Sequence, residues 1–217
     1  DRRLQGPNGP IDFFNDEASE PPAVTDIVSA INSGAGILAV DSNHVTISNT
    51  TIGGCSGGCV RVQDVDAPME MTLTGVTLHE CDGGAISVHG SASGSHVTAS
   101  HTSISSCSAS HGAALYLEAK DLTAIASITF EAGTISDCTA TSSSDVDGSG
   151  GAIYANGNRA SVTLKSTTIT RSSAATDGGV AAIITGTMSA SEVSVVGSSA
   201  GKAGGCFYVN SGELELV

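Results

Sequence analysis

The most constraining feature of this chain is an eleven-residue phrase that occurs six times. It reads VTISNTTIGGC at Val45–Cys55 and MTLTGVTLHEC at Met71–Cys81, and it returns at residues 97–107, 128–138, 162–172 and 188–198. Apolar residues occupy the first, third and eighth positions of each copy, and Cys or Ser occupies the eleventh. Offsets that persist while the residues change indicate a repeated backbone geometry.

The spacing of the phrase predicts stacked coils of strands. Val45, Met71 and Val97 lie 26 residues apart, as do Cys55 and Cys81. A period between about 20 and 50 residues is typical of repeat arrays in which each unit packs on its neighbours. Apolar and polar residues alternate within the phrase, which is the period of a β-strand and not of a helix.

A second phrase completes each coil. It reads GGCVRVQ at residues 57–63 and GGAISVH at 83–89, with related copies at 112–118, 150–156, 178–184 and 204–210. The glycines suit a tight corner, and equivalent segments that run in one direction form parallel ladders about 4.8 Å apart. Parallel crossovers are right-handed. The sequence therefore predicts an all-β, right-handed parallel β-helix of about seven coils over residues 35–217, with residues 36–42 in the first.

The GGAI phrases at Gly83–Ile86 and Gly150–Ile153, followed by strands such as VTLKSTTI, resemble the repeats of bacterial polymorphic outer-membrane proteins. The resemblance covers about residues 36–217. It implies a β-helical surface adhesin. Where those repeats carry Asn in a second phrase, this chain carries Cys or Ser at its eleventh position.

The two ends of the stack raise separate expectations. Residues 1–34 are expected to form an extended segment and then a short capping helix over 22–34, because Val24, Ile27, Val28 and Ile31 have helical spacing before Gly34. One irregular extra strand is the alternative. At the other end, Leu214 and Leu216 are expected to point inward in an open coil. We expect that coil to be followed by more chain or to bind another protein subunit, because an open coil exposes apolar core and strand edges.

The six cysteines permit several states. Four of them share one ladder, in which the Cα atoms of cysteines on adjacent coils are expected to lie close enough for a disulfide. Pairing of Cys55 with Cys81, of Cys107 with Cys138, or of Cys55 with Cys59 is open on distance alone. In-register side chains point the same way, which favours buried, unpaired thiols at these positions and in Cys59 and Cys206. No arrangement typical of a zinc site is evident.

The side chains predicted to face outward after each Gly-Gly corner form two columns. The first comprises Ala39, Arg61, Ser87, Tyr116, Tyr154, a residue near 182 and Tyr208; the second comprises Asp41, Gln63, His89, Glu118, Asn156 and Asn210. Tyrosine rings beside amides and carboxylates suit a sugar ring. We therefore name Tyr116, Tyr154, Tyr208, Glu118, Asn156 and Asn210 as candidate glycan-binding residues. Tyrosine is also favoured at exposed strand positions for structural reasons alone.

An enzyme of the pectin-degrading β-helix type is the main alternative. Glycoside hydrolysis needs two carboxyl groups about 5–9.5 Å apart, whereas Asp41 and Glu118 are predicted to lie three coils, or about 14 Å, apart. Arg61 with Asp64 and Asp66 is the only hint of lyase chemistry. The loop at residues 145–150 begins like a calcium loop, but Asn156 stands at its closing position. We predict no catalytic residues, metal or cofactor.

A third hypothesis is ice binding. Threonines are predicted to form an exposed ladder, with Ser48, Thr74 and Ser100 beside its first rungs; the ladder comprises Thr46, Thr72, Thr98, Thr129 and Thr163. Glu131 and Lys165 interrupt the neighbouring column. Threonine, like tyrosine, is also favoured at exposed strand positions.

The formal charge of −14, with only 8 basic residues, argues against nucleic acid or an anionic membrane as a partner, because both bind through clustered Lys and Arg. No apolar run approaches the roughly 20 residues of a membrane span. The sequence favours a non-catalytic, extracellular or cell-surface β-helix with a structural or adhesive role. Its expected partners are other protein subunits and glycans.

Overall fold

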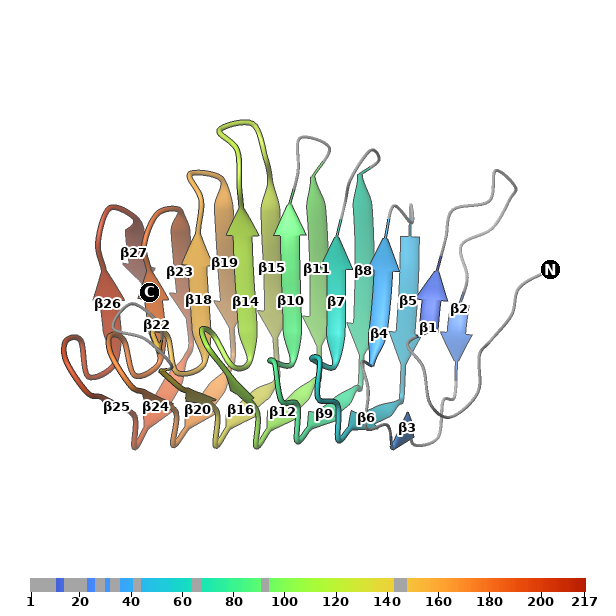
Figure 1. Ribbon diagram of the computed structural model, residues 1–217, viewed down its shortest axis with the longest axis horizontal. Coiled ribbons are helices and arrows are strands. Elements are labelled where there is room, and N and C mark those ends of the chain that lie inside the picture. The colour runs from blue at the N-terminus through green and yellow to red at the C-terminus, as the bar shows by residue number, and fades with distance from the viewer. Residues whose placement is uncertain are drawn as a thin grey trace.

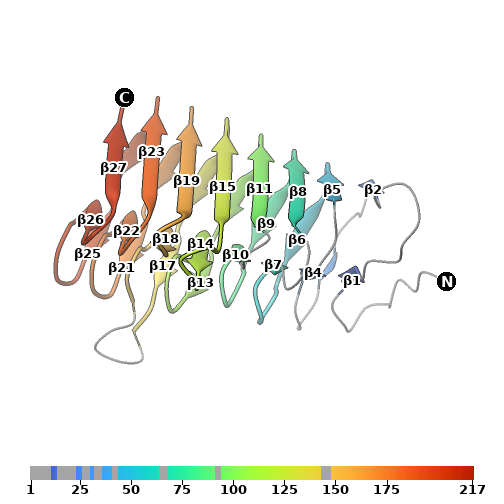
Figure 2. The same ribbon diagram turned by 90° about the horizontal axis from the view of Figure 1, so that it is seen from above.

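The protein is a stack of parallel β-strands (Figures 1 and 2). The computed structural model describes residues 11–13, 23–25, 30–31, 36–40, 44–63, 68–90, 94–142 and 148–217, and all regular elements in these ranges are strands. Every strand pair is parallel, and the strands form three long sheets and one short sheet. The described residues contain no helix long and apolar enough to cross a lipid bilayer.

Each coil places one strand in each long sheet in turn. Sheet A comprises β1 (Ile11–Phe13), β4 (Ile37–Val40), β7 (Val60–Gln63), β10 (Ile86–Gly90), β14 (Leu115–Ala119), β18 (Ile153–Asn156), β22 (Ala181–Ile183) and β26 (Phe207–Val209). Sheet B comprises β2 (Ala23–Thr25), β5 (His44–Ser48), β8 (Met69–Thr74), β11 (Ser95–Ser100), β15 (Ala126–Glu131), β19 (Ala160–Lys165), β23 (Thr187–Ser191) and β27 (Glu213–Leu216).

Two further sheets close the coil. Sheet C comprises β3 (Ala30–Ile31), β6 (Thr51–Gly53), β9 (Thr77–His79), β12 (Ser103–Ser105), β16 (Thr134–Ser136), β20 (Thr168–Thr170) and β24 (Ser194–Val196). The short sheet D comprises β13 (Ser108–Ala109), β17 (Thr139–Ala140), β21 (Ser173–Ala174) and β25 (Ser199–Ala200). In Figure 1, sheet A faces the viewer, sheet B lies behind it and sheet C runs along the bottom.

The predicted parallel β-helix is confirmed, and its register follows the repeat. Val45 pairs with Met71, and Val97 pairs with Met71 on one side and Ile128 on the other. The insertions that break the 26-residue period lie in the connections between strands, so they leave the register unchanged. Seven coils run from β4 onward, and β1, β2 and β3 form one more coil before them.

The expected capping helix is wrong where this segment is described. Ala23–Thr25 is strand β2, which pairs with β5, and Ala30–Ile31 is strand β3, which pairs with β6. The rest of residues 22–34 lies outside the described residues. The stacked strands of the next coil offer unpaired backbone groups at their edge, and satisfying these groups outweighs the helical spacing of the apolar side chains.

The core is a set of apolar ladders inside the coils. Residues at equivalent positions lie on top of one another, as in Ile47, Leu73, Ala99, Phe130 and Leu164, which are all fully buried. Phe130 pairs with Leu164 on one side and with the small Ala99 on the other, which leaves room for its ring. Gly133 leaves further room, since a Cβ there would lie 2.8 Å from the Phe130 Cζ. Ile86, Val88, Leu115, Leu117, Ile153 and Ala155 point inward as predicted.

Left-handed backbone turns the chain between sheets at two corners of each of the six coils from β4 to β24. The corner between sheets B and C uses Asn49, Gly75, His101, Ala132, Ser166 and Glu192, all with φ between 46° and 63°. The next corner uses Gly54, Glu80, Ser106, Asp137, Arg171 and Gly197. This conformation is energetically unfavourable for residues other than Gly. The stacking of the coils must therefore hold these residues in it.

Side chains stabilise these corners from inside the coil. After the first corner, Thr50 and Thr167 donate from Oγ1 to the carbonyl oxygen two residues earlier, at 2.7 Å and 2.9 Å. After the second, Cys107 donates from Sγ to the Ser105 carbonyl oxygen at 3.2 Å, and the free thiols of Cys55 and Cys138 make the same contact at 3.6 Å and 3.4 Å. The Cys81 Sγ lies 3.6 Å from the His79 carbonyl oxygen, but it is disulfide-bonded and has no proton to donate.

The two serines at the eleventh position do not repeat this contact: the buried Ser172 Oγ has no hydrogen-bond partner, and the Ser198 Oγ lies 3.3 Å from the Cys206 Sγ. The six residues at this position therefore share a small side chain and not a common hydrogen bond.

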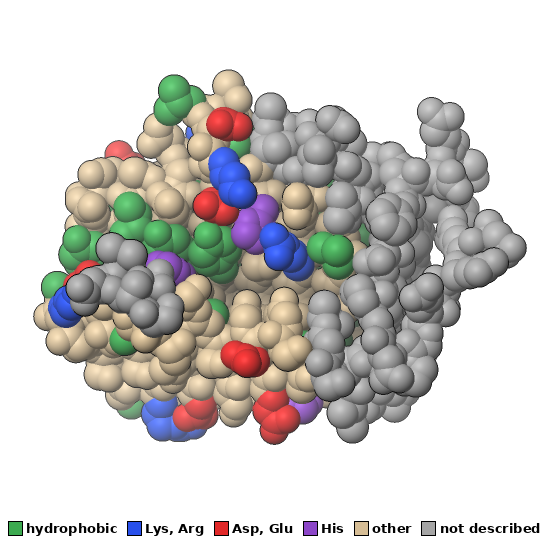
Figure 3. Space-filling view, viewed as in Figure 1, with side chains coloured by type: hydrophobic (Ala, Val, Ile, Leu, Met, Phe, Trp, Pro, Cys, Tyr) green, Lys and Arg blue, Asp and Glu red, His purple; other side chains and the backbone are tan. Residues whose placement is uncertain are grey.

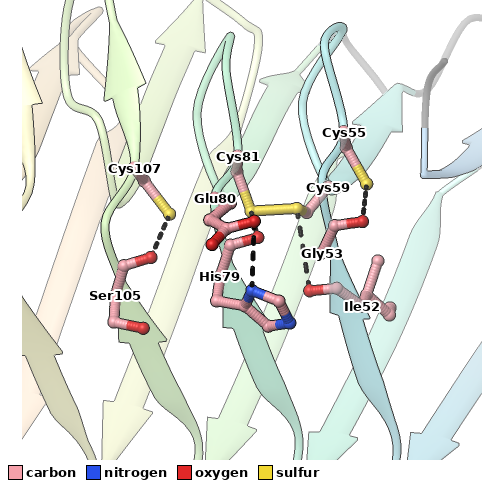
Figure 4. The surroundings of a disulfide bond; sticks show 9 residues. All are labelled: Ile52, Gly53, Cys55, Cys59, His79, Glu80, Cys81, Ser105 and Cys107. Atoms are coloured by element: carbon pink, nitrogen blue, oxygen red, sulfur yellow. Dashed lines mark hydrogen bonds and ion pairs between the residues drawn. A yellow bond between two sulfur atoms is a disulfide. The ribbon is translucent and has the colours of Figure 1, made fainter. Parts of the chain in front are cut away.

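One disulfide joins two coils (Figure 4). It links Cys59 to Cys81, with a Cα–Cα distance of 5.5 Å. The expectation that these two cysteines are unpaired is wrong. Cys59 follows the Gly-Gly corner and Cys81 ends the eleven-residue phrase of the next coil, so the sulfurs approach from different ladders. In-register side chains within one ladder lack that opposed geometry.

The other four cysteines are free thiols, of which Cys55, Cys107 and Cys138 are buried and Cys206 is exposed. Burial raises the pKa of Cys55, and the nearby Cys107 adds to the effect. A hydrogen bond with Cys107 raises the pKa of Cys138, and burial raises it further. A raised pKa lowers the thiolate population, so these two side chains are poor nucleophiles at neutral pH.

The last coil is the most exposed part of the stack. Leu214 is half-buried against the core, and Leu216 pairs with the buried Ala190, so both occupy inward positions as expected. Leu216 is nevertheless 60% exposed, because it lies in the last strand of the stack. Val196 and Val209 at the same end are 60% and 38% exposed. Docking of another subunit on this coil stays a prediction.

Creating a cavity in the central ladder should destabilise the fold. Replacing Phe130 by Ala should lower the free energy of unfolding by about 3–5 kcal/mol, because Ala99 and Gly133 cannot fill the space. Chemical denaturation followed by circular dichroism would measure the change. Leu122→Ala, at a site 78% exposed, is the control and should shift stability by no more than about 0.5 kcal/mol.

The disulfide should be detectable by counting thiols. Unreduced protein in denaturant should yield four thiols per chain, and six would contradict the Cys59–Cys81 bond. The double change Cys59→Ala and Cys81→Ala should reduce the free energy of unfolding by about 3 kcal/mol, because it frees a loop with a sequence separation of 22. Cys206→Ala, at an exposed free thiol, is the matched control.

Candidate functional site

The outer face of sheet A carries a tyrosine pair. Tyr116 on β14 and Tyr154 on β18 are partners in the strand register, and their rings stack with centroids 5.5 Å apart and planes 8° apart. Both are half-buried. The prediction that these two tyrosines lie together on an outward face is confirmed.

Two histidines complete the aromatic cluster. The His89 ring on β10 lies with its centroid 5.4 Å from that of Tyr116, and His111 lies 4.6 Å from Tyr154. His89 was predicted in the second outward column. His111 was missed as a neighbour of Tyr154, because it precedes the Gly112 corner and strand periodicity does not place residues in corners. We call these four residues the aromatic cluster.

Beside the cluster, His89 is bound to Glu118. The His89 Nδ1 and the Glu118 Oε2 lie 3.2 Å apart, and the two side chains are only 18% and 26% exposed. Lys120 Nζ lies 3.8 Å from the same carboxylate oxygen. Glu118 therefore has two partners, and Lys120 compensates its charge.

Burial controls protonation in this region. Burial lowers the pKa of His89 and so does the positive charge of Arg61, while the contact with Glu118 opposes both. The imidazole is therefore neutral at pH 7. The pKa of Tyr116 is raised by burial first and then by Glu118, and the pKa of Tyr154 is raised by the same two causes. Both phenols stay protonated at neutral pH and can donate hydrogen bonds.

A hollow of about 330 Å³ adjoins the cluster. Glu118 and Asn156 form part of its wall, together with Lys120, Asp121, Asn158 and Thr185. Thr185 Oγ1 donates to Asn156 Oδ1 at 3.2 Å and accepts a hydrogen bond from Gly157 N at 2.6 Å, which fixes that side of the wall. Figure 3 shows charged and histidine side chains beside hydrophobic ones at the centre of this face.

The structure separates the remaining candidates from this cluster. Tyr208 is two strands away from Tyr154, because Ala182 occupies the rung between them. Asn210 lies just beyond β26 and is exposed. Ala39 is fully buried, so its predicted outward position is wrong: Leu38 pairs with Arg61 and takes the outward rung. Asp41, Asp64, Asp66 and residues 145–147 lie outside the described residues.

Lys120, Asp121, Asn158 and Thr185 were not predicted. Lys120 and Asn158 continue the outward alternation of Glu118 and Asn156, so extending the two columns by two residues would have found them. Thr185 and Asp121 stand in connections between strands, where the repeat gives no register. Across the described ranges, no three His, Cys, Asp or Glu side chains gather to hold a metal ion.

The outer face of sheet B carries the predicted threonine ladder. Thr46, Thr72, Thr98, Thr129 and Thr163 are in register, and Ser189 continues the row. Glu131 and Lys165 pair in the neighbouring column, as the sequence indicated. The ladder is confirmed, and ice binding stays a prediction.

Comparison with known proteins identifies the fold alone. A family model described as "Right handed beta helix region" matches residues 35–216. No curated protein and no solved structure matches the chain.

The pKa of His89 is a direct test of this electrostatic arrangement. NMR titration should give a value below the ordinary His value of about 6.5. Arg61→Gln should raise that value by removing a positive charge, and Glu118→Gln should lower it further by removing the negative partner.

The lowered pKa of His89 also predicts how the stability of the fold depends on pH. A lowered folded pKa means that the unfolded chain takes up the proton first as the pH falls. The His89 contribution to stability should therefore be present above about pH 6.5 and decline as the pH falls toward the folded pKa. Shifts of the His89 pKa opposite to those given for Arg61→Gln and Glu118→Gln would contradict the arrangement.

Proposed function

The chain belongs to the family of right-handed β-helix proteins, and we propose that it is a non-catalytic adhesive module, outside the cell or on its surface, that binds glycans on sheet A. One observation carries this proposal: stacked tyrosines lie beside a polar hollow on a rigid sheet. Ligand sites are typically concave and combine apolar or aromatic surface with a few fixed polar groups.

The chemistry of the cluster suits a sugar. Tyrosine presents an apolar ring to the C–H face of a pyranose and a hydroxyl to its rim. Glu118, Asn156 and Thr185 supply acceptors and donors for sugar hydroxyls. The contact of Glu118 with His89 and the hydrogen bond from Thr185 to Asn156 hold them in place before a ligand arrives. Such prior ordering lowers the entropy cost of binding.

The protonation states favour binding over catalysis. A phenol with a raised pKa is a hydrogen-bond donor at neutral pH and a poor general base. The Glu118 carboxylate is already engaged by His89 and Lys120. A polysaccharide-cleaving enzyme is the alternative, for which a neutral His89 beside Glu118 would be the candidate base.

Two features support a location outside the cell. Disulfides such as Cys59–Cys81 persist mainly in oxidising compartments. The resemblance of the GGAI phrases to bacterial polymorphic outer-membrane adhesins favours the same location. Parallel stacking also gives a stiff scaffold on which an exposed binding face keeps its shape.

The tyrosine pair should be necessary for glycan binding. We expect Tyr116→Ala to weaken binding on an oligosaccharide array at least tenfold, because it removes the ring that contacts the ligand. Tyr208→Ala removes the same side chain two or more strands away and should change affinity less than twofold.

Two results would contradict the proposed function. One is the absence of binding to any glycan by the folded wild-type protein. The other is release of reducing ends from a bound polysaccharide, abolished by Glu118→Gln, which would show an enzyme and not an adhesive module.

A further inference from the structure

The stacking of Tyr116 on Tyr154 limits where a sugar ring can lie. Their planes differ by only 8°, and the two residues are in register on adjacent strands, so the ring faces point along the axis of the stack. Each ring therefore covers one face of the other. A ligand can reach only the opposite face of Tyr116, toward β10, or the opposite face of Tyr154, toward β22.

The side toward β22 offers no opening. Ala182 pairs with Tyr154, and although it stands in the outward column, it has no exposed surface. Tyr208 occupies the next rung. A ligand could not reach the sheet between these two tyrosines.

The side toward β10 has a small residue on the adjacent rung. Ser87 pairs with Tyr116 on one side and with Arg61 on the other. Ser87 is half-buried and Arg61 is exposed. The small serine therefore separates Tyr116 from Arg61 along this face of the sheet. We call the space over this serine the Ser87 slot.

The width of the Ser87 slot fits one sugar ring. Tyr116 and Arg61 are two strand spacings apart, or about 9.6 Å. A ring stacked on Tyr116 at a carbon contact of about 4 Å leaves roughly 5–6 Å, within which an exocyclic group can reach the guanidinium. His89, two residues along β10 on the same face, packs its ring against Tyr116 with centroids 5.4 Å apart and planes tilted by 44°, so a ligand shares this side of Tyr116 with the imidazole.

Charge around the slot selects the ligand. The chain carries a formal charge of −14, yet the residue across Ser87 from Tyr116 is an arginine, which binds planar oxyanions with paired N–H donors. Glu118 is the nearby carboxylate on this face, and Lys120 compensates it at 3.8 Å. Arg61 pairs with Ser87 in the register, so its charge belongs to the rung next to the slot.

We propose that the Ser87 slot binds a sugar ring that carries an anionic group, with the ring against Tyr116 and the oxyanion on Arg61. The proposal rests on the proposed glycan-binding function and makes it specific. A carboxylate of a uronic acid and a sulfate ester share the required chemistry.

The test measures binding of three immobilised probes: a uronic-acid oligosaccharide, its carboxyl-reduced neutral counterpart, and a sulfated neutral oligosaccharide. We expect the wild-type protein to bind at least one anionic probe at least tenfold more tightly than the neutral probe. The two anionic probes distinguish a carboxylate from a sulfate ligand. Arg61→Gln should remove this preference, whereas Lys165→Gln, which removes an exposed cation from sheet B, should keep it.

Filling the slot gives a second test. Ser87→Phe adds a ring that suits an exposed strand position and should abolish binding of the anionic probe while the melting temperature is retained. Ser161→Phe, the same change at a half-buried outward serine of β19, should leave binding unchanged.

The possible failures are distinguishable. If Tyr116→Ala abolishes binding but Ser87→Phe and Arg61→Gln do not, the Ser87 slot is wrong and the glycan-binding function stands. Equal affinity for the neutral and anionic probes also overturns the inference. Absence of binding to all three probes and to the wider array overturns both.

Discussion

In-register parallel stacking is the constraint on which the rest of this structure depends. Each strand satisfies its backbone groups with the coils before and after it, at a spacing of about 4.8 Å. Because the register does not slip, every side chain lies over its equivalent in the next coil, as Leu115 lies over Ile153 and Thr98 lies beside Thr72. Substitutions must therefore be judged by ladders and not by single contacts: Phe130 is accommodated because Ala99 is below it and Gly133 is beside it.

Stacking also explains residues that would be unfavourable elsewhere. Non-glycine residues such as Glu80 and His101 adopt a left-handed backbone conformation at corners. This conformation is energetically unfavourable for a non-glycine residue outside such a stack. The backbone hydrogen bonds of the stack, together with the Thr and Cys donors that bond to the carbonyl two residues earlier, hold these corners in place. The cysteine ladder is therefore first a set of corner residues, and only Cys81 in it is also part of the disulfide.

A repeat makes a uniform surface, so a ligand site must come from departures from the repeat. On sheet A the departures are the tyrosine pair on β14 and β18, the small Ser87 on β10, and the connections that supply His111 and Thr185. They occur on neighbouring coils, which brings residues as far apart in sequence as Arg61 and Thr185 onto one face. Sheet B shows the opposite case: its hydroxyl ladder is regular over six strands, and the hollow described above is lined by residues of sheet A and its connections.

The sequence by itself determined the parallel β-helix, the register from β7 onward, the inward ladders and the outward position of Tyr116 and Tyr154, because a strict period and strand alternation fix which residues share a ladder. It could not determine what happens where periodicity ends. The apolar spacing within residues 22–34 predicts a helix, but Ala23–Thr25 and Ala30–Ile31 are strands that pair with the next coil. Strand alternation predicts Ala39 to face outward, whereas it is buried. The Cys59–Cys81 disulfide joins two different ladders, so no spacing within one ladder reveals it. The stacking of the tyrosine rings, the pairing of His89 with Glu118, and the packing of His89 against Tyr116 depend on side-chain contacts between coils, which only the tertiary structure decides.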